Sequence, residues 1–273
     1  MKFSVLMSVY YKEKPEFLKQ SIDSVLNQTC KPTEIVLVKD GPLTDELEAV
    51  LKKVDEENPD LLHFVPLSEN VGLGKALARG VQECSYELIA RMDTDDLAVP
   101  DRFERQLKEF ELNPQLDICG SHIKEFETDI KNPTGARKVP IEDADIKEYQ
   151  KRRDAFNHMT VMYKKSKVLA AGNYQHALLM EDSLLWVNMI MAGANCKNID
   201  DYLVFARADS SMIERRGGFA YFLKYKQGRK RIKETGYISN FDYYYTLAVQ
   251  LVVALIPSEI RKKIFRVLLR SAA

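Results

Sequence analysis

The sequence predicts an α/β protein built on a doubly wound, mostly parallel sheet with helices on both faces, followed by a helical C-terminal tail. Three observations lead to this prediction. Over the first 112 residues, short runs rich in Val, Ile and Leu alternate with amphipathic helical segments. The apolar runs are continuous, as expected of parallel strands that are buried on both faces. The chain has 273 residues, 45% of them apolar, which is enough to fill the core of one large domain.

Each predicted element has its own signal. The strand candidates are residues 3–9, 34–38, 61–65 and 87–92, and after them residues 117–127, 160–164 and 202–208. The helix candidates are residues 15–28, 45–57, 74–84, 100–112 and 182–193. Two of these helices start on proline, at Pro15 and Pro100. Proline fits the first helical turn because the N–H that it lacks would have no partner there. The polar stretch 128–154 is assigned no element.

The charges are balanced overall but unevenly distributed. Lys plus Arg and Asp plus Glu total 40 each, so the formal net charge is zero, which argues against a nucleic-acid binder. Residues 207–273, however, hold 14 Lys or Arg against 5 Asp or Glu, a net charge of +9. A basic segment of this kind predicts a partner surface, and anionic lipid is one candidate.

Cysteine usage and the N-terminus both favour the cytoplasm. The four cysteines are scattered and form no C-x-x-C pair, so neither a zinc site nor a disulfide framework is expected. Met1–Lys2 leads directly into the first apolar run, without the longer apolar core and small-residue cleavage site of a signal peptide. We therefore expect a cytoplasmic protein.

Polar or aromatic residues follow each of the first four predicted strands. Ligands of doubly wound sheets bind at the carboxyl ends of the strands, so these residues should meet on one rim. They are Tyr10–Tyr11, Lys39–Asp40–Gly41, Glu69–Asn70–Val71–Gly72 and Asp93–Thr94–Asp95–Asp96. Asp, Asn and Gly are also turn formers, which explains the second and third groups equally well. Turn formation does not explain three aspartates within four positions.

The three aspartates predict a site for a divalent cation. Like charges this close repel one another and resist desolvation, so a positive group is expected between them. On an extended backbone Asp93 and Asp95 would share one face, with Cα atoms roughly 6.6 Å apart. Carboxylate oxygens suit Mg²⁺ or Mn²⁺, and Mg²⁺ is often shared between carboxylates and substrate phosphates. Asp93, Asp95 and Asp96 are therefore predicted to bind Mn²⁺ or Mg²⁺ together with a diphosphate.

Seven motifs occur in the order typical of one enzyme family. They are SVLMSVYY, EIVLVKDGP, ENVGLGKAL, RMDTDDLAVPDR, FNHMTVMYKKS, AGNY and MEDSLLW. Through them, residues 1–210 resemble the family 2 glycosyltransferases, which are inverting enzymes with the GT-A fold that use nucleotide-sugar donors. The sequence is most similar to small bacterial members that build exopolysaccharide, capsule or O-antigen units. The Q-x-x-R-W motif of processive members is absent, so the resemblance implies the addition of single sugars.

The resemblance also implies where the donor binds. Ser8 and Tyr10 match positions that line the nucleoside pocket, where Tyr10 would stack on the base. Asp40 matches the carboxylate that hydrogen-bonds the uracil edge, so UDP is the implied nucleotide, and Asn70 joins these residues on the rim. The family's A-R-N-x-G arginine is missing here, and Lys75 could supply that charge. The three aspartates match the D-x-D region that holds ribose, sugar and metal.

Further residues are implied in catalysis and acceptor binding. The pair Glu181–Asp182 matches the acidic pair that contains the catalytic base, usually its aspartate, which would remove a proton from the acceptor hydroxyl. Acids in a first helical turn also complement the helix dipole, so helix capping is an alternative. His158 either faces the acceptor or makes a structural hydrogen bond. Arg215 and Arg216 could close over the leaving diphosphate or form a solvated basic turn.

The C-terminal region predicts a helical tail at a membrane surface. The predicted divisions are 1–112 (nucleotide-sugar-binding half), 113–210 (acceptor half) and 211–273 (basic helical region). Residues 243–258 are 16 uncharged residues. As a helix they would span about 24 Å, short of the ~30 Å hydrocarbon core, so no transmembrane span is expected. Residues 260–270 form a basic amphipathic segment that suits anionic lipid, and packing on the domain or a dimer contact is the alternative.

The sequence as a whole predicts an inverting, non-processive glycosyltransferase. It would move a sugar from a nucleotide-sugar, with UDP favoured, to a hydroxyl of a saccharide acceptor linked to a lipid such as a polyprenyl diphosphate. The expected place is the inner face of the plasma membrane, in bacterial surface polysaccharide synthesis. A sugar-phosphate nucleotidyltransferase is one alternative, but it would normally show an N-terminal glycine-rich phosphate loop, and SVYYKEKPEF has no glycine. A non-catalytic, membrane-bound scaffold is the other, and the presence of every candidate carboxylate argues against it.

Overall fold

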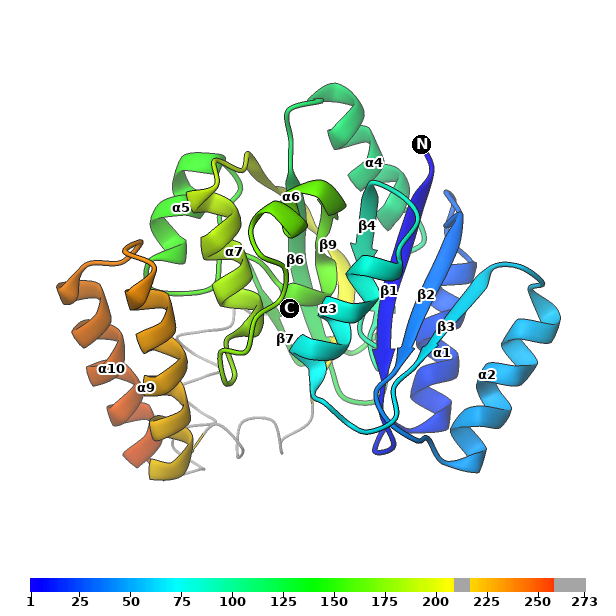
Figure 1. Ribbon diagram of the computed structural model, residues 1–273, viewed down its shortest axis with the longest axis horizontal. Helices are drawn as coiled ribbons and strands as arrows, with labels where there is room; N and C mark the ends of the chain where they lie inside the picture. The colour runs from blue at the N-terminus through cyan, green and yellow to red at the C-terminus, as the bar shows by residue number, and fades with distance from the viewer. Residues whose placement is uncertain (209–216, 258–273) are drawn as a thin grey trace.

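The computed structural model describes residues 1–208 and 217–257. Within them the strands form one nine-stranded sheet in the order β3-β2-β1-β4-β8-β6-β9-β5, with β7 paired to β6. Helices cover both faces of the sheet, and two C-terminal helices lie at one end of the molecule (Figure 1). The predicted α/β class, with helices on both faces and a helical tail, is confirmed.

The N-terminal part of the sheet is parallel, as predicted. Its strands are β1 (Phe3–Val9), β2 (Glu34–Lys39), β3 (Leu62–Pro66) and β4 (Leu88–Arg91). Every residue of β1 except Ser8 is buried. The strand is covered on both faces, which explains why its sequence is apolar without alternation.

Beyond β4 the sheet becomes mixed. The remaining strands are β5 (Leu97–Ala98), β6 (Ile118–Phe126), β7 (Gly135–Arg137), β8 (Met162–Lys164) and β9 (Cys196–Arg207). Strand β8 is antiparallel to β4 and β6, whereas β9 is parallel to β6. The predicted start of the last strand at residue 202 is wrong, because β9 begins at Cys196. Its first residues include the polar Lys197 and Asn198, which give no apolar strand pattern although they pair with β6.

Most helix boundaries follow the predictions. The helices are α1 (Pro15–Leu26), α2 (Asp45–Glu57), α3 (Leu73–Glu83), α4 (Arg102–Leu112), α5 (Asp143–Gln150), α6 (Lys165–Ala170), α7 (Glu181–Met191), α9 (Phe219–Glu234) and α10 (Asn240–Leu255). Helix α4 does not start on Pro100, which lies in the preceding turn, where its carbonyl accepts a hydrogen bond from the Thr29 N–H at 2.8 Å. The stretch 128–154, to which no element was assigned, contains β7 and α5.

The sheet separates two hydrophobic cores. Helices α1, α2 and α4 pack on one face, against Phe3, Val5 and Met7 of β1. Helices α3, α5, α6 and α7 pack on the other, against Leu6 of the same strand. With both faces covered, the carboxyl ends of β1, β2 and β4 open into polar loops at one edge of the sheet, where ligands of such sheets bind.

The two C-terminal helices pack against each other, and α9 also packs against α7. A small third core joins them, formed by Ala177, Met180, Leu184, Val187, Ile232 and Ile238. Helix α10 begins with a capping box, in which Ser239 accepts from the Asp242 N–H and Asp242 accepts from the Ser239 N–H. Among the described residues, no helix has both the length and the apolar character to cross a membrane. The basic amphipathic segment 260–270 lies outside the described residues.

Candidate active site

A cavity of about 1940 Å³ runs from the carboxyl ends of the parallel strands to α9 and α10. It is larger than the roughly 300–1,000 Å³ of a typical small-ligand site, so it has room for more than one ligand. The predicted site residues that line it are Ser8, Tyr10, Asp40, Asn70, Asp93, Asp95, Asp96, His158 and Asp182. The rim predicted from the strand ends therefore exists, and the acceptor-half residues His158 and Asp182 face the same space.

Asp93, Asp95 and Asp96 converge as predicted, but through a different backbone shape. One carboxylate oxygen from each lies within 4.8 Å of the others. The expectation of an extended strand here is wrong, because the chain bends after β4. The Ser21 hydroxyl donates to the Asp93 carbonyl at 2.6 Å, and the Arg207 Nε donates to the Asp95 carbonyl at 3.1 Å. These two bonds hold the bend and thereby bring the three carboxylates together.

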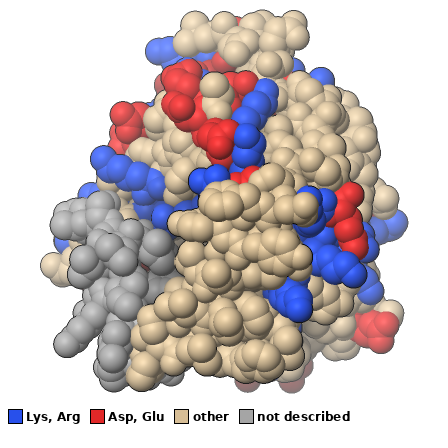
Figure 2. All heavy atoms as spheres, turned by 90° about the vertical axis from the view of Figure 1, so that its left-hand side faces the viewer, with Lys and Arg blue, Asp and Glu red and all other residues tan. Residues whose placement is uncertain are grey.

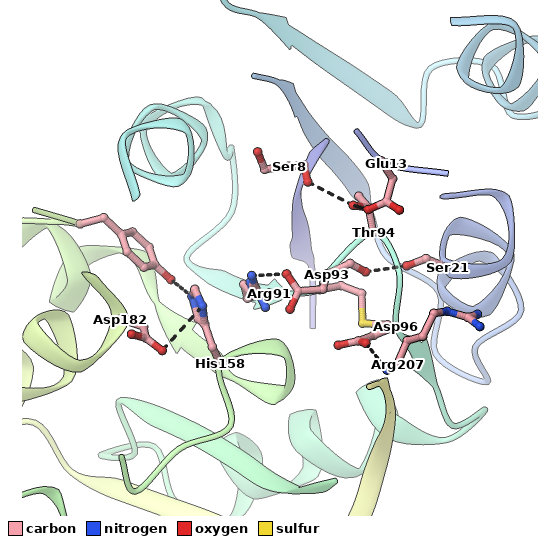
Figure 3. A network of polar contacts seen from close by, with 12 residues as sticks. Ser8, Glu13, Ser21, Arg91, Asp93, Thr94, Asp96, His158, Asp182 and Arg207 are labelled. Carbon is pink, nitrogen blue, oxygen red and sulfur yellow. Dashed lines mark hydrogen bonds and ion pairs between the residues drawn. The ribbon is translucent and has the colours of Figure 1, made fainter. Parts of the chain in front are cut away.

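Part of the positive charge that the aspartates require comes from Arg91, which was not among the predicted site residues. Arg91, the last residue of β4, is 1% exposed and forms an ion pair with Asp93. The backbone N–H of Arg207 donates to Asp96 at 2.7 Å, which satisfies one carboxylate oxygen but adds no positive charge. Figure 3 shows Arg91 between Asp93 and the pair formed by His158 and Asp182. The sequence did carry a signal for Arg91: it is a charged residue within an apolar strand, two positions before Asp93, where a buried ion pair would explain it.

Arg91 does not neutralise the whole cluster. Burial, with the neighbouring acids adding to it, raises the pKa of Asp95 to about 7 and the pKa of Asp96 well above its usual range. One oxygen of Asp96, Oδ2, is buried and has no hydrogen-bond partner among the described residues. A buried carboxylate oxygen without a partner is costly. Three carboxylates with one unsatisfied oxygen therefore fit a hard divalent cation such as Mg²⁺ or Mn²⁺.

Asp40 organises the loop between β3 and α3. It is 4% exposed, and its carboxylate accepts hydrogen bonds from the Asn70 side chain at 3.1 Å and from the Val71 and Gly72 N–H groups at 2.8 and 3.1 Å. Gly41, with φ of +86°, allows this close approach, because a Cβ there would lie 2.7 Å from the Asn70 nitrogen. The Asp40 carboxylate thus already accepts hydrogen bonds from the loop. Its predicted hydrogen bond to the uracil edge stays a prediction.

Asp182 lies in the first turn of α7, next to a histidine and a tyrosine. Its carboxylate accepts from the Ser183 N–H at 2.8 Å, and its other oxygen is 4.0 Å from His158 Nδ1. His158 Nε2 is 2.9 Å from the Tyr174 hydroxyl. Desolvation, followed by the charge of Asp154, raises the pKa of Asp182 to about 7. Burial lowers the pKa of His158 well below its usual value, so the imidazole is neutral beside the carboxyl.

The second acid of the pair, Glu181, points elsewhere. Its side chain packs across Gly74 of α3, where a Cβ would lie 2.6 Å from Glu181 Cγ. Asp182 lines the cavity and Glu181 is not among the described residues that do so. Both acids lie in the first turn of α7, so they suit the helix dipole. Dipole compensation alone does not require Asp182 to face the cavity.

Three other residues were predicted to bind the donor. Lys75 is exposed in the first turn of α3 and is not among the residues that line the cavity. Arg215 and Arg216 lie outside the described residues. The predicted roles of these three residues stay predictions.

Comparison with solved structures shows which fold this is. The fold resembles that of Staphylococcus aureus TarS residues 1–349 in complex with UDP-GlcNAc, with a TM-score of 0.61 and 18% identity over 97% of this chain and 70% of that chain. It also resembles the mannosyltransferase PcManGT from Pyrobaculum calidifontis in complex with GDP-Man and Mn²⁺, with a TM-score of 0.62 and 16% identity over 96% and 78%. A longer TarS chain is matched over 42% of its length. The fold is thus the GT-A fold of glycosyltransferases.

The sequence relatives are closer and define the family. Residues 4–168 match the family model "Glycosyl transferase family 2", and this chain belongs to that family. It is 40% identical to the amylovoran biosynthesis glycosyltransferase AmsE of Erwinia amylovora, over 89% of this chain and 91% of the relative. It is 33% identical to the UDP-Gal:alpha-D-GlcNAc-diphosphoundecaprenol beta-1,3-galactosyltransferase of Escherichia coli, over 98% and 97%. The protein is therefore a glycosyltransferase, as the motifs predicted.

Proposed function

We propose that this glycosyltransferase moves one sugar at a time from a UDP-sugar to a saccharide hydroxyl on a polyprenyl-diphosphate-linked acceptor, with inversion, in bacterial surface polysaccharide synthesis. One observation carries the proposal: the aspartate cluster and Asp182 face one cavity from opposite halves of the chain. The names of the two relatives support the details, because one is named for amylovoran biosynthesis and the other for a UDP-sugar donor and a diphosphoundecaprenol acceptor. Family membership argues against the nucleotidyltransferase alternative.

The N-terminal half, residues 1–112, would bind the donor. Tyr10 is exposed within the cavity and presents an aromatic face on which a base can stack. Ser8 and Asn70 line the same end. Asp93, Asp95 and Asp96 would hold Mn²⁺ or Mg²⁺ beside the diphosphate. When bound, such a cation stabilises the charge that develops on the leaving nucleoside diphosphate.

The acceptor half, residues 113–210, would supply the base. Asp182 takes the proton from the acceptor hydroxyl while the oxygen attacks the anomeric carbon. The bond from that carbon to the diphosphate oxygen breaks on the opposite side, which inverts the configuration in one displacement. His158, neutral and 4.0 Å from Asp182, would orient the acceptor and the carboxylate through its ring nitrogen.

A donor panel tests this proposal. Purified full-length protein is incubated with a set of UDP-, GDP- and dTDP-sugars and Mn²⁺, and slow donor hydrolysis is followed by release of the nucleoside diphosphate. We expect one UDP-sugar to be hydrolysed above the others. Proton NMR of a transfer product should then show inversion at the anomeric carbon. Hydrolysis of no member of the panel, or a retained configuration, would contradict the proposal.

The pKa of Asp182 predicts a rising pH profile. A base with a pKa of about 7 is mostly protonated, and so inactive, at lower pH. The turnover number at saturating donor and Mn²⁺ should therefore rise about tenfold per pH unit below 7 and level off above it. Donor affinity, measured by titration at each pH, separates titration of the base from titration of Asp95. A turnover number that is flat or falls between pH 5.5 and 8.5 would contradict the role of Asp182.

We also propose that the protein associates with the inner face of the plasma membrane through α10. One side of this helix is apolar and exposed at helical spacing; its residues, the α10 apolar face, are Phe241, Tyr244, Tyr245, Val249, Val252 and Leu255. Figure 2 shows a broad uncharged surface on this side of the molecule, with Lys and Arg, and also some Asp and Glu, at its margins. Aromatic and aliphatic side chains flanked by cations suit the headgroup region of anionic lipid.

Point substitutions test the membrane proposal better than truncation, because α10 also lines the cavity. The double variant Val252→Asp, Leu255→Asp places two charges on the α10 apolar face. We expect co-sedimentation with phosphatidylglycerol-containing vesicles to fall at least tenfold, since each buried aliphatic side chain is worth about 1.5–3 kcal/mol. Leu112→Asp, on the exposed end of α4, is the control and should bind as the wild type does. Unchanged vesicle binding of the double variant, or a dimer lost with the substitutions, would instead assign this face to another role.

A further inference from the structure

The cavity continues past Asp182 into a part that neither the donor nor the base explains. This part, the distal pocket, is bounded by α9 and α10 and is lined by Tyr225, Arg229, Tyr245 and Val249, among other residues. It belongs to the same continuous space as the aspartate cluster. A ligand in the distal pocket could therefore extend to Asp182 without leaving the protein.

Arg229 is a buried cation with unused hydrogen-bonding capacity. It is 2% exposed, and its Nη2 donates to the Lys151 carbonyl at 2.7 Å. Its Nε is buried and has no hydrogen-bond partner among the described residues. A buried guanidinium without full pairing costs folding free energy. This cost is the physical reason to look for a bound group that completes its hydrogen bonds. An anion with several oxygens would do so.

The packing of α9 fixes Arg229 relative to the catalytic residues. The preceding residue, Gly228, lies so close to the segment before α7 that a Cβ would be 2.5 Å from the Ala177 carbonyl and 2.7 Å from the Leu178 carbonyl. That segment leads directly into Glu181–Asp182. The absence of a side chain at Gly228 therefore lets α9 hold Arg229 at a set place beside the start of α7.

The wall of the distal pocket continues onto the surface of α10. Tyr245 and Val249 line the cavity and also belong to the α10 apolar face. Arg152, at the same rim, is paired with Asp242 at 2.6 Å and lies over the rings of Phe241 and Tyr245. A buried cation, an aromatic rim and an exposed apolar helix face thus follow one another from the cavity outward.

We propose that Arg229 binds the diphosphate of the acceptor, and that the isoprenyl chain leaves the cavity over Tyr245 and Val249 along the α10 apolar face. This inference rests on the proposed function, since it names how that acceptor is held. A guanidinium offers several donors in one plane, which matches the oxygens of a diphosphate. The acceptor sugar then points from the diphosphate toward Asp182.

The test is a binding measurement on the full chain that needs no turnover. Farnesyl diphosphate and farnesol are titrated calorimetrically in the same detergent, with Mn²⁺ and the nucleoside diphosphate product of donor hydrolysis present to fill the donor site. We expect farnesyl diphosphate to bind at least tenfold more tightly than farnesol, and inorganic diphosphate to compete weakly. Arg229→Met should remove most of this preference, a loss on the order of 10- to 100-fold, as expected for hydrogen bonds to a charged group. Arg229→Lys should retain part of it.

Lys230→Met is the matched control, because Lys230 neighbours Arg229 on α9 but is exposed and pairs with Glu234. It should bind farnesyl diphosphate as the wild type does. Thermal unfolding and nucleoside diphosphate affinity report whether the Arg229 variants are folded. Equal binding of the alcohol and the diphosphate by the wild type, or an unchanged preference in a folded Arg229→Met, would overturn the inference. If donor hydrolysis persists in either case, only the acceptor anchor is lost; if the wild type hydrolyses no nucleotide sugar, the proposed function fails independently.

Discussion

Replacing Asp182 with Asn is expected to lower the turnover number for sugar transfer by ~10²–10⁴-fold, the usual contribution of a general base. The amide keeps the oxygen that accepts from the Ser183 N–H, so the first turn of α7 should stay in place. It cannot take a proton from the acceptor hydroxyl. Donor affinity should remain near that of the wild type, because Arg91 and His158 lie between Asp182 and the aspartate cluster (Figure 3). The measurement is initial rate at saturating donor and acceptor, together with a calorimetric donor titration.

The comparison variant for this prediction is Glu181→Gln. Glu181 is in the same helical turn, but its side chain packs over Gly74. We expect a much smaller loss of turnover than in Asp182→Asn. If Glu181→Gln lost more than Asp182→Asn, the assignment of the base within the pair would be reversed. A donor affinity that collapsed along with the rate would instead indicate that Asp182 has a structural role.

The second large effect is expected at the aspartate cluster. Asp96→Asn should weaken binding of the donor in the presence of Mn²⁺ by about 10- to 100-fold or more. Losses of this size are typical when a residue that merely hydrogen-bonds a metal ligand is replaced, and Asp96 is proposed to bind the metal itself. The amide removes a negative charge and places an N–H₂ donor or a neutral oxygen where a hard cation prefers carboxylate. Excess chelator should abolish turnover by the wild type, and added Mn²⁺ should restore it. Full turnover in excess chelator would exclude the metal from the reaction.

Stability provides the control for Asp96→Asn. The folded-state pKa of Asp96 lies above its unfolded value, so the folded state holds this proton more tightly. That contribution to stability is present at low pH and is lost as the pH rises through the folded-state pKa. At pH 8 with chelator, Asp96 of the wild type is therefore either an ionised carboxylate that is buried without a cation or a carboxyl group that stays protonated at a pH where it would ionise in the unfolded chain. Asn does not ionise, so the midpoint of thermal unfolding of Asp96→Asn should equal or exceed that of the wild type under these conditions. A lower midpoint would attribute the loss of donor binding to misfolding.

Local patterns were sufficient to predict the N-terminal half of the fold. Strands such as Phe3–Val9 and helices such as Asp45–Glu57 are encoded by short-range periodicity and by turn residues, which any window of the sequence displays. The rim followed from them, because parallel strands place their carboxyl ends on one edge. Polar strands were harder to predict. Strand β9 begins at Cys196 and runs through polar residues, and it is a strand because β6 pairs with it. Pairing across the sheet is not written in the local pattern.

The order of the motifs and the identity of their acids were enough to place this chain among the glycosyltransferases and to name Asp93, Asp95, Asp96 and Asp182. Only the tertiary structure decided which side chains lie beside these acids and pair with them. It buried Arg91 beside Asp93, set His158 next to Asp182 and turned Glu181 away toward Gly74. It also brought Arg229, from a helix that begins after the matched family region, to the wall of the same cavity. The physical reason is that burial and charge–charge distance set the pKa of a group and its free hydrogen-bonding capacity, and both depend on residues far apart along the chain.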